Sequence, residues 1–160
     1  MSANIIAIVG DSGSGKTYAS LYLQEHFGWN AIVSYTTRPK RKYEKNGREH
    51  WFVSDKDMPS KSNMCAYTQF GGFHYWTEWN QFQTLFNSVY VIDEKGLIDL
   101  CSKEQTPIRF NLITVKIKRP NKEGIEKDRM ERDKERTNLA DEFYDYVVEN
   151  DGSLEQYCEK

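Results

Sequence analysis

The chain has 160 residues, with 22 basic and 24 acidic side chains and a formal net charge of -2. This length fits one domain with its own core, and the near-neutral charge excludes a uniformly basic nucleic-acid coat protein. Three widely spaced cysteines without a CxxC pair indicate reduced thiols rather than a disulfide framework or a zinc site. No apolar run approaches the ~20 residues of a membrane span, and no signal peptide is visible, so we expect a cytoplasmic protein.

The predicted elements alternate between strands and helices along the chain. Strands are expected at 4–9, 31–36, 51–54, 65–70, 73–76, 89–93, 109–118 and 144–149, where apolar or β-branched runs are bounded by turn residues or charges. Helices are expected at 17–27, 78–86 and 94–103, and the highly charged stretch 123–138 is expected to form a solvated helix or a flap. This alternation is typical of βαβ units, so we expect an α/β fold around a mostly parallel sheet.

A phosphate-binding loop is predicted between the first strand and the first helix. The octet Gly10-Asp-Ser-Gly-Ser-Gly-Lys16-Thr17 matches the pattern GxxxxGK[ST]. Its glycines let backbone N–H groups point at a phosphate, and the following helix adds its positive dipole end. Lys16 is expected to reach the β- and γ-phosphates, and the Thr17 hydroxyl to ligate Mg²⁺. The residues expected to bind the triphosphate are Gly10, Ser12, Gly13, Ser14, Gly15, Lys16 and Thr17. The loop alone fits a kinase, a GTPase, a motor or a binder.

A second anion site is expected on the loop after the second strand. Arg38 and Arg41 carry forked donors that suit a phosphate. A solvated basic loop or a weak nucleic-acid patch would contain the same arginines. The two arginines by themselves therefore leave the ligand open.

The wider pattern around these arginines resembles the guanylate kinase family. It reads S-x-T-T-R-P-x-R-x-x-E-x-N-G from Ser34 to Gly47, followed by His50 and by Phe52-Val53. The resemblance continues more faintly at 75–77, 93–96 and 145–151. It implies a single domain, 1–160, with a three-layer P-loop fold and a central mostly parallel sheet. The core would span about 1–34 and 81–160, a small mixed nucleotide-binding insertion about 35–80, and a shortened lid about 119–136.

The resemblance also implies a reaction and a set of site residues. The reaction is transfer of the γ-phosphate of ATP, with Mg²⁺, to GMP or dGMP. The implied acceptor-binding residues are Ser34, Arg38, Arg41, His50 and Tyr75 at the phosphate, and Thr77 and Asp93 at the base. Asp93 would also organise the Mg²⁺ ion, and Asn150 would lie beside the donor adenine. Among the lid arginines, Arg129 is the first choice for the transferred phosphate and Arg132 the second, with Lys16 and Arg38 completing the catalytic charges.

Three positions depart from the family pattern. His50 replaces a tyrosine, and since an imidazolium donates more strongly to an anion, we expect the acceptor KM to rise as pH rises through the titration of His50. Ala66 replaces a guanine-binding glutamate, whose hydrogen bond would be worth roughly 1.5–3 kcal/mol, or about 10–150-fold. Trp76 replaces a glycine. Phosphate binding is thus better supported than guanine preference.

These departures keep other functions open. Ala66 and Trp76 motivate a related P-loop kinase that acts on another nucleoside monophosphate or on a sugar phosphate. A non-catalytic guanylate-kinase-like binding module is a further alternative, although such a module has no need for the intact Lys16-Thr17 pair. The neutral chain argues against nucleic-acid binding. We expect small-molecule nucleotide substrates, no membrane partner, and a monomer or weak dimer.

Overall fold

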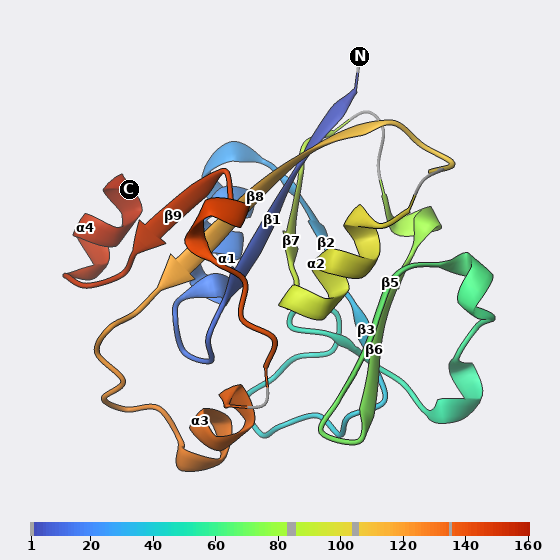
Figure 1. The fold of residues 1–160 in the computed structure, drawn as a ribbon, viewed down its shortest axis with the longest axis horizontal. Helices are drawn as coiled ribbons and strands as arrows, with labels where there is room; N and C mark the ends of the chain where they lie inside the picture. Colours follow the sequence, from blue (N-terminus) through green and yellow to red (C-terminus); the bar gives the residue numbers. More distant parts are fainter. Residues whose placement is uncertain (1, 83–85, 104–105, 135) are drawn as a thin grey trace.

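The computed structural model describes residues 2–82, 86–103, 106–134 and 136–160. Within these ranges a five-stranded sheet forms the centre of the molecule, with the strand order β2-β7-β1-β8-β9 (Figure 1). Its strands are β1 (Ala3–Gly10), β2 (Asn30–Ile32), β7 (Ser88–Val91), β8 (Phe110–Lys118) and β9 (Tyr146–Glu149). Every neighbouring pair is parallel. The carboxyl ends of these strands therefore lie at one edge, where α/β folds bind ligands.

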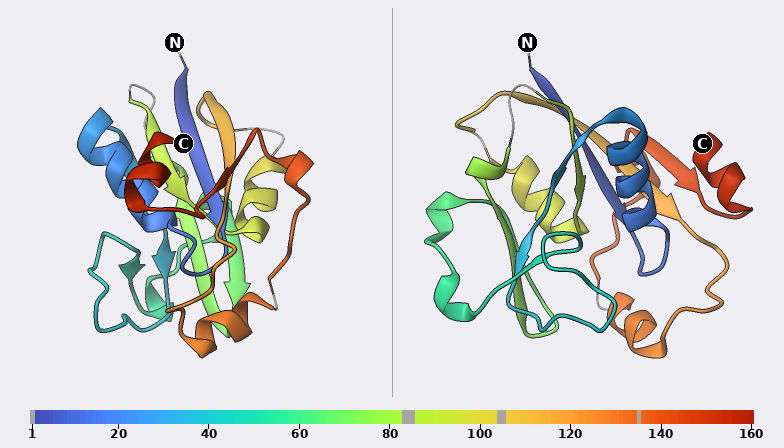
Figure 2. Two further views of the ribbon diagram at one scale, coloured as in Figure 1. Left: turned by 90° about the vertical axis from the view of Figure 1, so that its left-hand side faces the viewer. Right: turned by 180° about the vertical axis from the view of Figure 1, so that it is seen from behind.

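Alternating side chains of β1 build a core on each face of this sheet. Ile5, Ala7 and Val9 belong to one buried cluster, together with Leu97 and Leu100 of α2 (Glu94–Cys101). Ile6 and Ile8 belong to the other, against α1 (Lys16–Phe27) and α4 (Leu154–Glu159). Helices α1 and α2 accordingly cover opposite faces (Figure 2). The three-layer α/β fold expected from the sequence is confirmed.

A smaller, mixed sheet lies beside the central one (Figure 1). It has the order β4-β3-β6-β5 and consists of β3 (Tyr35–Thr36), β4 (Trp51–Phe52), β5 (Met64–Phe70) and β6 (Phe73–Glu78). Strands β3 and β4 are parallel, whereas β6 runs antiparallel to both β3 and β5. Short 3₁₀ turns occupy 55–57 and 61–63 between β4 and β5.

Several expected elements differ from the structure. The single strand expected at 31–36 is two strands, β2 and β3, because 33–34 crosses from one sheet to the other. The helix expected at 78–86 is wrong: β6 continues to Glu78 and a single 3₁₀ turn, Trp79–Gln81, follows, while 83–85 lies outside the described residues. The Gln81 amide accepts from the Glu78 N–H and donates to the Val33 carbonyl, which ties this turn to the sheet. The last strand begins at Tyr146 instead of 144.

The charged stretch near the C-terminal end of β8 forms only a short helix. Helix α3 (Lys127–Asp133) replaces the longer helix expected at 123–138. Gly124, with φ of +79°, takes a left-handed conformation just before it, which is incompatible with a helix that begins at 123. The figures place α3 close to the loop between β1 and α1. No helix in the described part of the chain is long and apolar enough to span a membrane.

Candidate active site

The loop between β1 and α1 has the backbone of a phosphate cradle. Gly13 and Gly15 have φ values of +72° and +106°, which other residues rarely adopt. A Cβ atom at Gly15 would lie 2.9 Å from the Asn150 amide nitrogen, so the position also lacks space for a side chain. The chain can therefore turn tightly into α1 and leave its N–H groups available to an anion.

Two side chains of the C-terminal segment form hydrogen bonds with this loop. The Asn150 side-chain amide donates to the Ser14 carbonyl at 2.9 Å, and the Tyr157 hydroxyl donates to the Gly15 carbonyl at 3.0 Å. Asn150, expected beside the donor adenine, thus contacts the loop itself. Tyr157 was not expected at the site, because nothing in the local pattern of its helix marks it as functional.

Lys16 lies folded back into the loop. Its ammonium donates to the carbonyls of Gly10 at 2.6 Å and Asp11 at 2.7 Å. Burial, together with the positive charge of Arg136, lowers the pKa of Lys16 to about 7. The protonated form of Lys16 is thus disfavoured in the free loop, and an anionic phosphate bound there would favour it.

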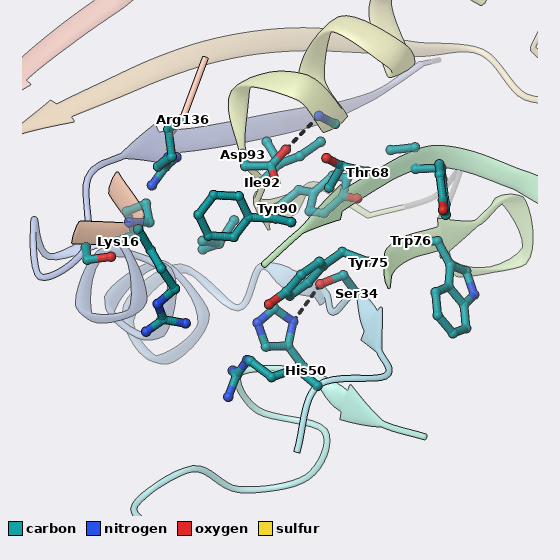
Figure 3. A pocket seen from close by; sticks show the side chains of 18 of the residues that line it. Lys16, Ser34, His50, Thr68, Tyr75, Trp76, Tyr90, Ile92, Asp93 and Arg136 are labelled. Atoms are coloured by element: carbon teal, nitrogen blue, oxygen red, sulfur yellow. Dashed lines mark hydrogen bonds between the residues drawn. The ribbon is translucent and has the colours of Figure 1, made fainter. Parts of the chain in front are cut away.

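Two residues at the end of α3 and beyond it bind the loop directly. Asp133 accepts from the Ser12 N–H at 3.0 Å and from its hydroxyl at 2.9 Å. Arg136 donates to the Gly10 carbonyl at 2.8 Å and, through Nε and Nη2, to Glu94 Oε2 at 3.1 and 2.7 Å. Glu94 is only 4% exposed, so the pair lies in the interior. Figure 3 shows Arg136 above Lys16 at the same end of the pocket.

The two arginines chosen from the lid are held less tightly than Arg136. Arg129 lines a cavity of about 410 Å³ together with Thr17, and its buried Nε has no hydrogen-bond partner in the part of the chain that the structure describes. Arg132 lines the neighbouring cavity together with Lys16, and its Nε donates to the Asp128 carbonyl at 3.2 Å. Both therefore border cavities that residues of the phosphate loop also line.

A half-buried carboxylate orients the arginines of the second anion site. Arg38, 7% exposed, donates from Nη2 and Nη1 to the two oxygens of Glu44 at 2.7 and 3.0 Å. Glu44 also accepts from the Arg41 N–H at 2.8 Å. Burial alone would raise the pKa of Glu44, but these bonds lower it to about 2. Glu44 was present in the sequence pattern without an assigned role; the structure makes it the group that fixes the arginine loop.

His50 lies next to Ser34 and Tyr75 (Figure 3). The Ser34 hydroxyl and His50 Nδ1 are 2.8 Å apart, and the imidazole ring meets the Tyr75 ring edge-on at 5.5 Å. Burial, assisted by the charge of Arg38, lowers the pKa of His50 to about 4. The imidazole of the free protein is therefore neutral near pH 7, so the expected effect of its titration on acceptor binding moves to lower pH.

The far end of the same pocket is mostly apolar. Ala66, Ile92 and the ring of Tyr90 line it, within a cavity of about 210 Å³ that also includes Lys16 (Figure 3). Asp93 contributes a carboxylate to this end of the pocket. Its Oδ1 accepts from the Gly96 N–H at 2.7 Å and so caps α2, and burial raises the pKa of Asp93.

Thr77 and Trp76, both singled out in the sequence, lie differently from each other. Thr77 is completely buried outside the lining of the pocket, and its hydroxyl bonds with Tyr90 Oη at 2.7 Å and Cys65 Sγ at 2.9 Å. Trp76 borders the pocket and stacks on Tyr35, with 5.6 Å between ring centroids. The family resemblance implies that Thr77 and Asp93 both contact the base. In the structure Asp93 borders the cavity and Thr77 does not.

The oxygen donors that the sequence assigned to Mg²⁺ are the Thr17 hydroxyl and the Asp93 carboxylate. The described residues contain no cluster of three or more His, Cys, Asp or Glu side chains that could hold a metal by themselves. Mg²⁺ commonly uses one or two protein oxygens together with substrate phosphates and water. These two side chains line adjoining cavities that share Lys16, so the donor set fits such an ion.

The two cavities form one continuous site. They share Lys16, Ser34, Arg38, Arg41 and His50 as lining residues. Two anion-binding loops, one after β1 and one after β3, therefore line the same pair of cavities. This arrangement can hold two phosphorylated molecules end to end, with cations between them.

Comparison with known proteins agrees with this arrangement. The family model described as guanylate kinase matches residues 2–160. The chain is 27% identical to a guanylate kinase of Protochlamydia amoebophila, covering 96% of this chain and 86% of that protein, and 26% identical to one of Chlamydia caviae, covering 96% and 83%. Its fold is similar to the crystal structure of a guanylate kinase from Anaplasma phagocytophilum, with a TM-score of 0.73 at 22% identity over 99% of this chain and 82% of that one. The chain belongs to the guanylate kinase family.

Proposed function

We propose that the protein is an ATP-dependent nucleoside monophosphate kinase that transfers the γ-phosphate of ATP to GMP or dGMP, giving ADP and the diphosphate. The observation that carries this proposal is the meeting of two anion sites at Lys16, Arg38 and Arg41 within one continuous cavity. Relatives across nearly the whole chain are guanylate kinases, which supports the choice of acceptor.

The reaction needs positioning and charge more than covalent chemistry. An oxygen of the acceptor phosphate attacks the γ-phosphorus, the bond from that phosphorus to the β–γ bridging oxygen breaks, and ADP leaves with the bridging oxygen. Arg38 and Arg41 hold the acceptor phosphate, with the Ser34 hydroxyl, the neutral His50 and Tyr75 at its other side. The loop amides and Lys16 hold the donor phosphates. No side chain acts as a nucleophile.

Mg²⁺ would be held by Thr17 and Asp93. When bound, the ion neutralises charge on the β- and γ-phosphates. The protein's own contribution at this point is the ammonium of Lys16. Because the pKa of Lys16 is lowered to about 7 in the free protein, arriving phosphates favour its protonated form and ATP binding takes up protons above pH 7.

The lid supplies the remaining cations and excludes water from the transferred phosphate. Arg129 and Arg132 line the two cavities, and α3 is anchored to the loop through Asp133 and Ser12. A phosphate in the loop competes with the Asp133 carboxylate for the Ser12 N–H, so donor binding repositions α3 over the nucleotide.

A second acceptor class is favoured by one observation. Ala66 is 2% exposed and lines the base end of the pocket, but its side chain offers no hydrogen bond. The protein therefore selects guanine over other bases less strongly than it would with a glutamate at this position. A different nucleoside monophosphate, or a sugar phosphate, is the alternative acceptor.

The test is a coupled ADP-release assay with ATP, Mg²⁺ and each ribo- and deoxynucleoside monophosphate, with sugar phosphates as a further set. We expect the highest kcat/KM with GMP or dGMP, and a kcat about 100–1000-fold lower for Lys16→Met. Turnover with sugar phosphates alone would establish the alternative. Absence of turnover with every acceptor, together with tight ATP binding, would identify a non-catalytic binding module.

The proposal includes the organisation of the chain. The core is assigned to about 1–34 and 81–160, the acceptor-binding insertion to about 35–80 and the lid to about 119–136. We also propose a cytoplasmic monomer or weak dimer that acts on small nucleotides without binding nucleic acid. Light scattering at two protein concentrations tests the oligomeric state, and a salt titration with DNA and RNA tests the last point.

A further inference from the structure

Two threonines on the paired strands β5 and β6 have opposite hydrogen-bonding states. Thr77 on β6 is saturated, since its hydroxyl bonds with both Tyr90 and Cys65. Thr68 on β5 is 7% exposed, and its Oγ1 has no hydrogen-bond partner among the residues that the structure describes. A buried hydroxyl without a partner destabilises a fold, so its presence requires a reason.

Packing does not supply that reason. Valine has the shape of threonine without the hydroxyl, and it would fill the same space in this strand without an unpaired polar atom. Thr68 lies two residues from Ala66 and therefore on the same face of β5, the face that borders the pocket. Thr68 therefore borders the pocket beside the apolar side chains of Ala66 and Ile92, with Asp93 as a second polar group of this wall.

The position of Thr68 matches that of an acceptor base. Arg38 and Arg41 line the cavity together with Ser34 and His50 of the second anion site. Figure 3 shows Ser34 and His50 at one part of this cavity, and Thr68, Asp93 and Ile92 at another. A nucleotide held by its phosphate at the arginines would place its base among the latter. Within this part, Thr68 and Asp93 offer complementary chemistry.

Asp93 and Thr68 differ in what they can offer to a base. Asp93 Oδ1 accepts from the Gly96 N–H, whereas its Oδ2 takes no hydrogen bond from the described chain. A carboxylate oxygen in this position suits an N–H group of a base. The Thr68 hydroxyl is then the group able to donate, and a ring carbonyl is the matching acceptor. A base that carries a carbonyl next to a ring N–H satisfies both.

We propose that Thr68 is a specificity-determining residue whose hydroxyl donates to the 6-oxo group of a purine monophosphate, while Asp93 accepts from the adjacent ring N–H. This inference rests on the proposed kinase function and assigns to Thr68 the recognition of the 6-oxo group of its acceptor. It also accounts for the unpaired hydroxyl: its partner arrives with the substrate.

The experiment compares three acceptors with matched variants. GMP carries both the 6-oxo and the 2-amino group, IMP only the 6-oxo group, and 2-aminopurine riboside monophosphate only the amino group. Thr68→Val should lower kcat/KM by about 3–10-fold with GMP and IMP, the range of one neutral hydrogen bond, and leave the value with 2-aminopurine riboside monophosphate and the KM for ATP unchanged. Thr68→Ser retains the hydroxyl and should keep the preference. Thr77→Val is the matched control, and any loss there should be equal for the three acceptors.

The possible results distinguish the role of Thr68 from the kinase function on which that role rests. An unchanged or uniform response of the three acceptors to Thr68→Val would overturn the role of Thr68, as would a Thr77→Val response equal to it. Wild-type protein needs no variant to give a second test: it should prefer GMP over 2-aminopurine riboside monophosphate, and equal use of both would overturn the inference even if Thr68→Val does not fold. Inactivity of the wild type with every monophosphate would instead refute the kinase function itself.

Discussion

The phosphate end and the base end of the site differ in how they are prepared for a ligand. At the phosphate end, Arg38 is bonded to Glu44, Arg136 to Glu94, and Lys16 to two carbonyls, so the charges are held in place before a ligand arrives. At the base end the wall is apolar and the Thr68 hydroxyl has no partner in the described residues.

This difference follows from the chemistry of the two parts of a nucleotide, its phosphate and its base. A phosphate is recognised by charge and by N–H donors, which the protein can orient with its own carboxylates and carbonyls. A base is recognised by a small number of neutral hydrogen bonds, whose partners come only with the substrate. Damage to the phosphate end should therefore remove catalysis, whereas changes at the base end should alter the choice of substrate.

The largest effect is expected at Lys16. Lys16→Met removes the cation that faces the donor phosphates, and loss of one such preorganised group typically lowers kcat by about 100–1000-fold. The fold should persist, because the Lys16 ammonium bonds only to carbonyls of its own loop. Steady-state kinetics measures the loss of kcat, and thermal melting shows whether the fold persists. A kcat within tenfold of wild type would show that the loop does not hold the reacting phosphate.

A similarly large effect is expected at Arg136, by a different route. Arg136→Met leaves the buried Glu94 carboxylate without its partner, which should lower the free energy of unfolding by about 3 kcal/mol. Arg136→Met with Glu94→Leu removes both charges and should recover most of that stability. Urea unfolding gives the comparison.

Activity separates the two roles of Arg136. If its charge also faces the transferred phosphate, the stable double variant should remain impaired in kcat. Recovery of kcat along with stability would instead restrict Arg136 to holding α2 and the loop together.

A smaller effect is expected at Ala66. Ala66→Glu places a carboxylate at the base end and should increase the preference for GMP over AMP by at least about tenfold, the lower range for a hydrogen bond to a charged group. Competition assays with the two monophosphates measure this ratio. An unchanged ratio at normal stability would mean that this part of β5 does not face the base.

No effect of pH is expected from His50 between pH 6 and 8. Because its pKa is lowered to about 4, the imidazole stays neutral throughout this range. His50→Gln should therefore change the acceptor KM by the same factor at each pH, and the ratio of variant to wild type cancels the titration of the substrate phosphate. A ratio that varies across this range would show that substrate raises the pKa of His50.

Protein stability should respond to His50 at lower pH. A lowered imidazole pKa stabilises the native state above the unfolded value near 6.5, and that contribution is lost as pH falls towards 4. Denaturant midpoints of wild type and His50→Gln should accordingly converge on acidification.

Local motifs were predicted well, because their atoms are close in sequence. The octet from Gly10 to Thr17 and the arginines at 38 and 41 both lie on the loops where the pattern placed them. The roles of Arg136 and Asp133 could not be predicted, because they depend on partners 42 and 121 residues away. The helix expected at 78–86 failed because the Gln81 side chain bonds back to the sheet.

By itself the sequence determined the alternation of strands and helices, the phosphate loop and the kinase resemblance, since each rests on spacing along a continuous stretch of chain. The tertiary structure decided which charges are neutralised, which hydroxyls are satisfied and which are left for a ligand. Thr68 and Thr77 are the same residue type on neighbouring strands, yet only one hydroxyl is paired. Both side chains are removed from water, so the presence or absence of one hydrogen-bond partner decides the state of each hydroxyl.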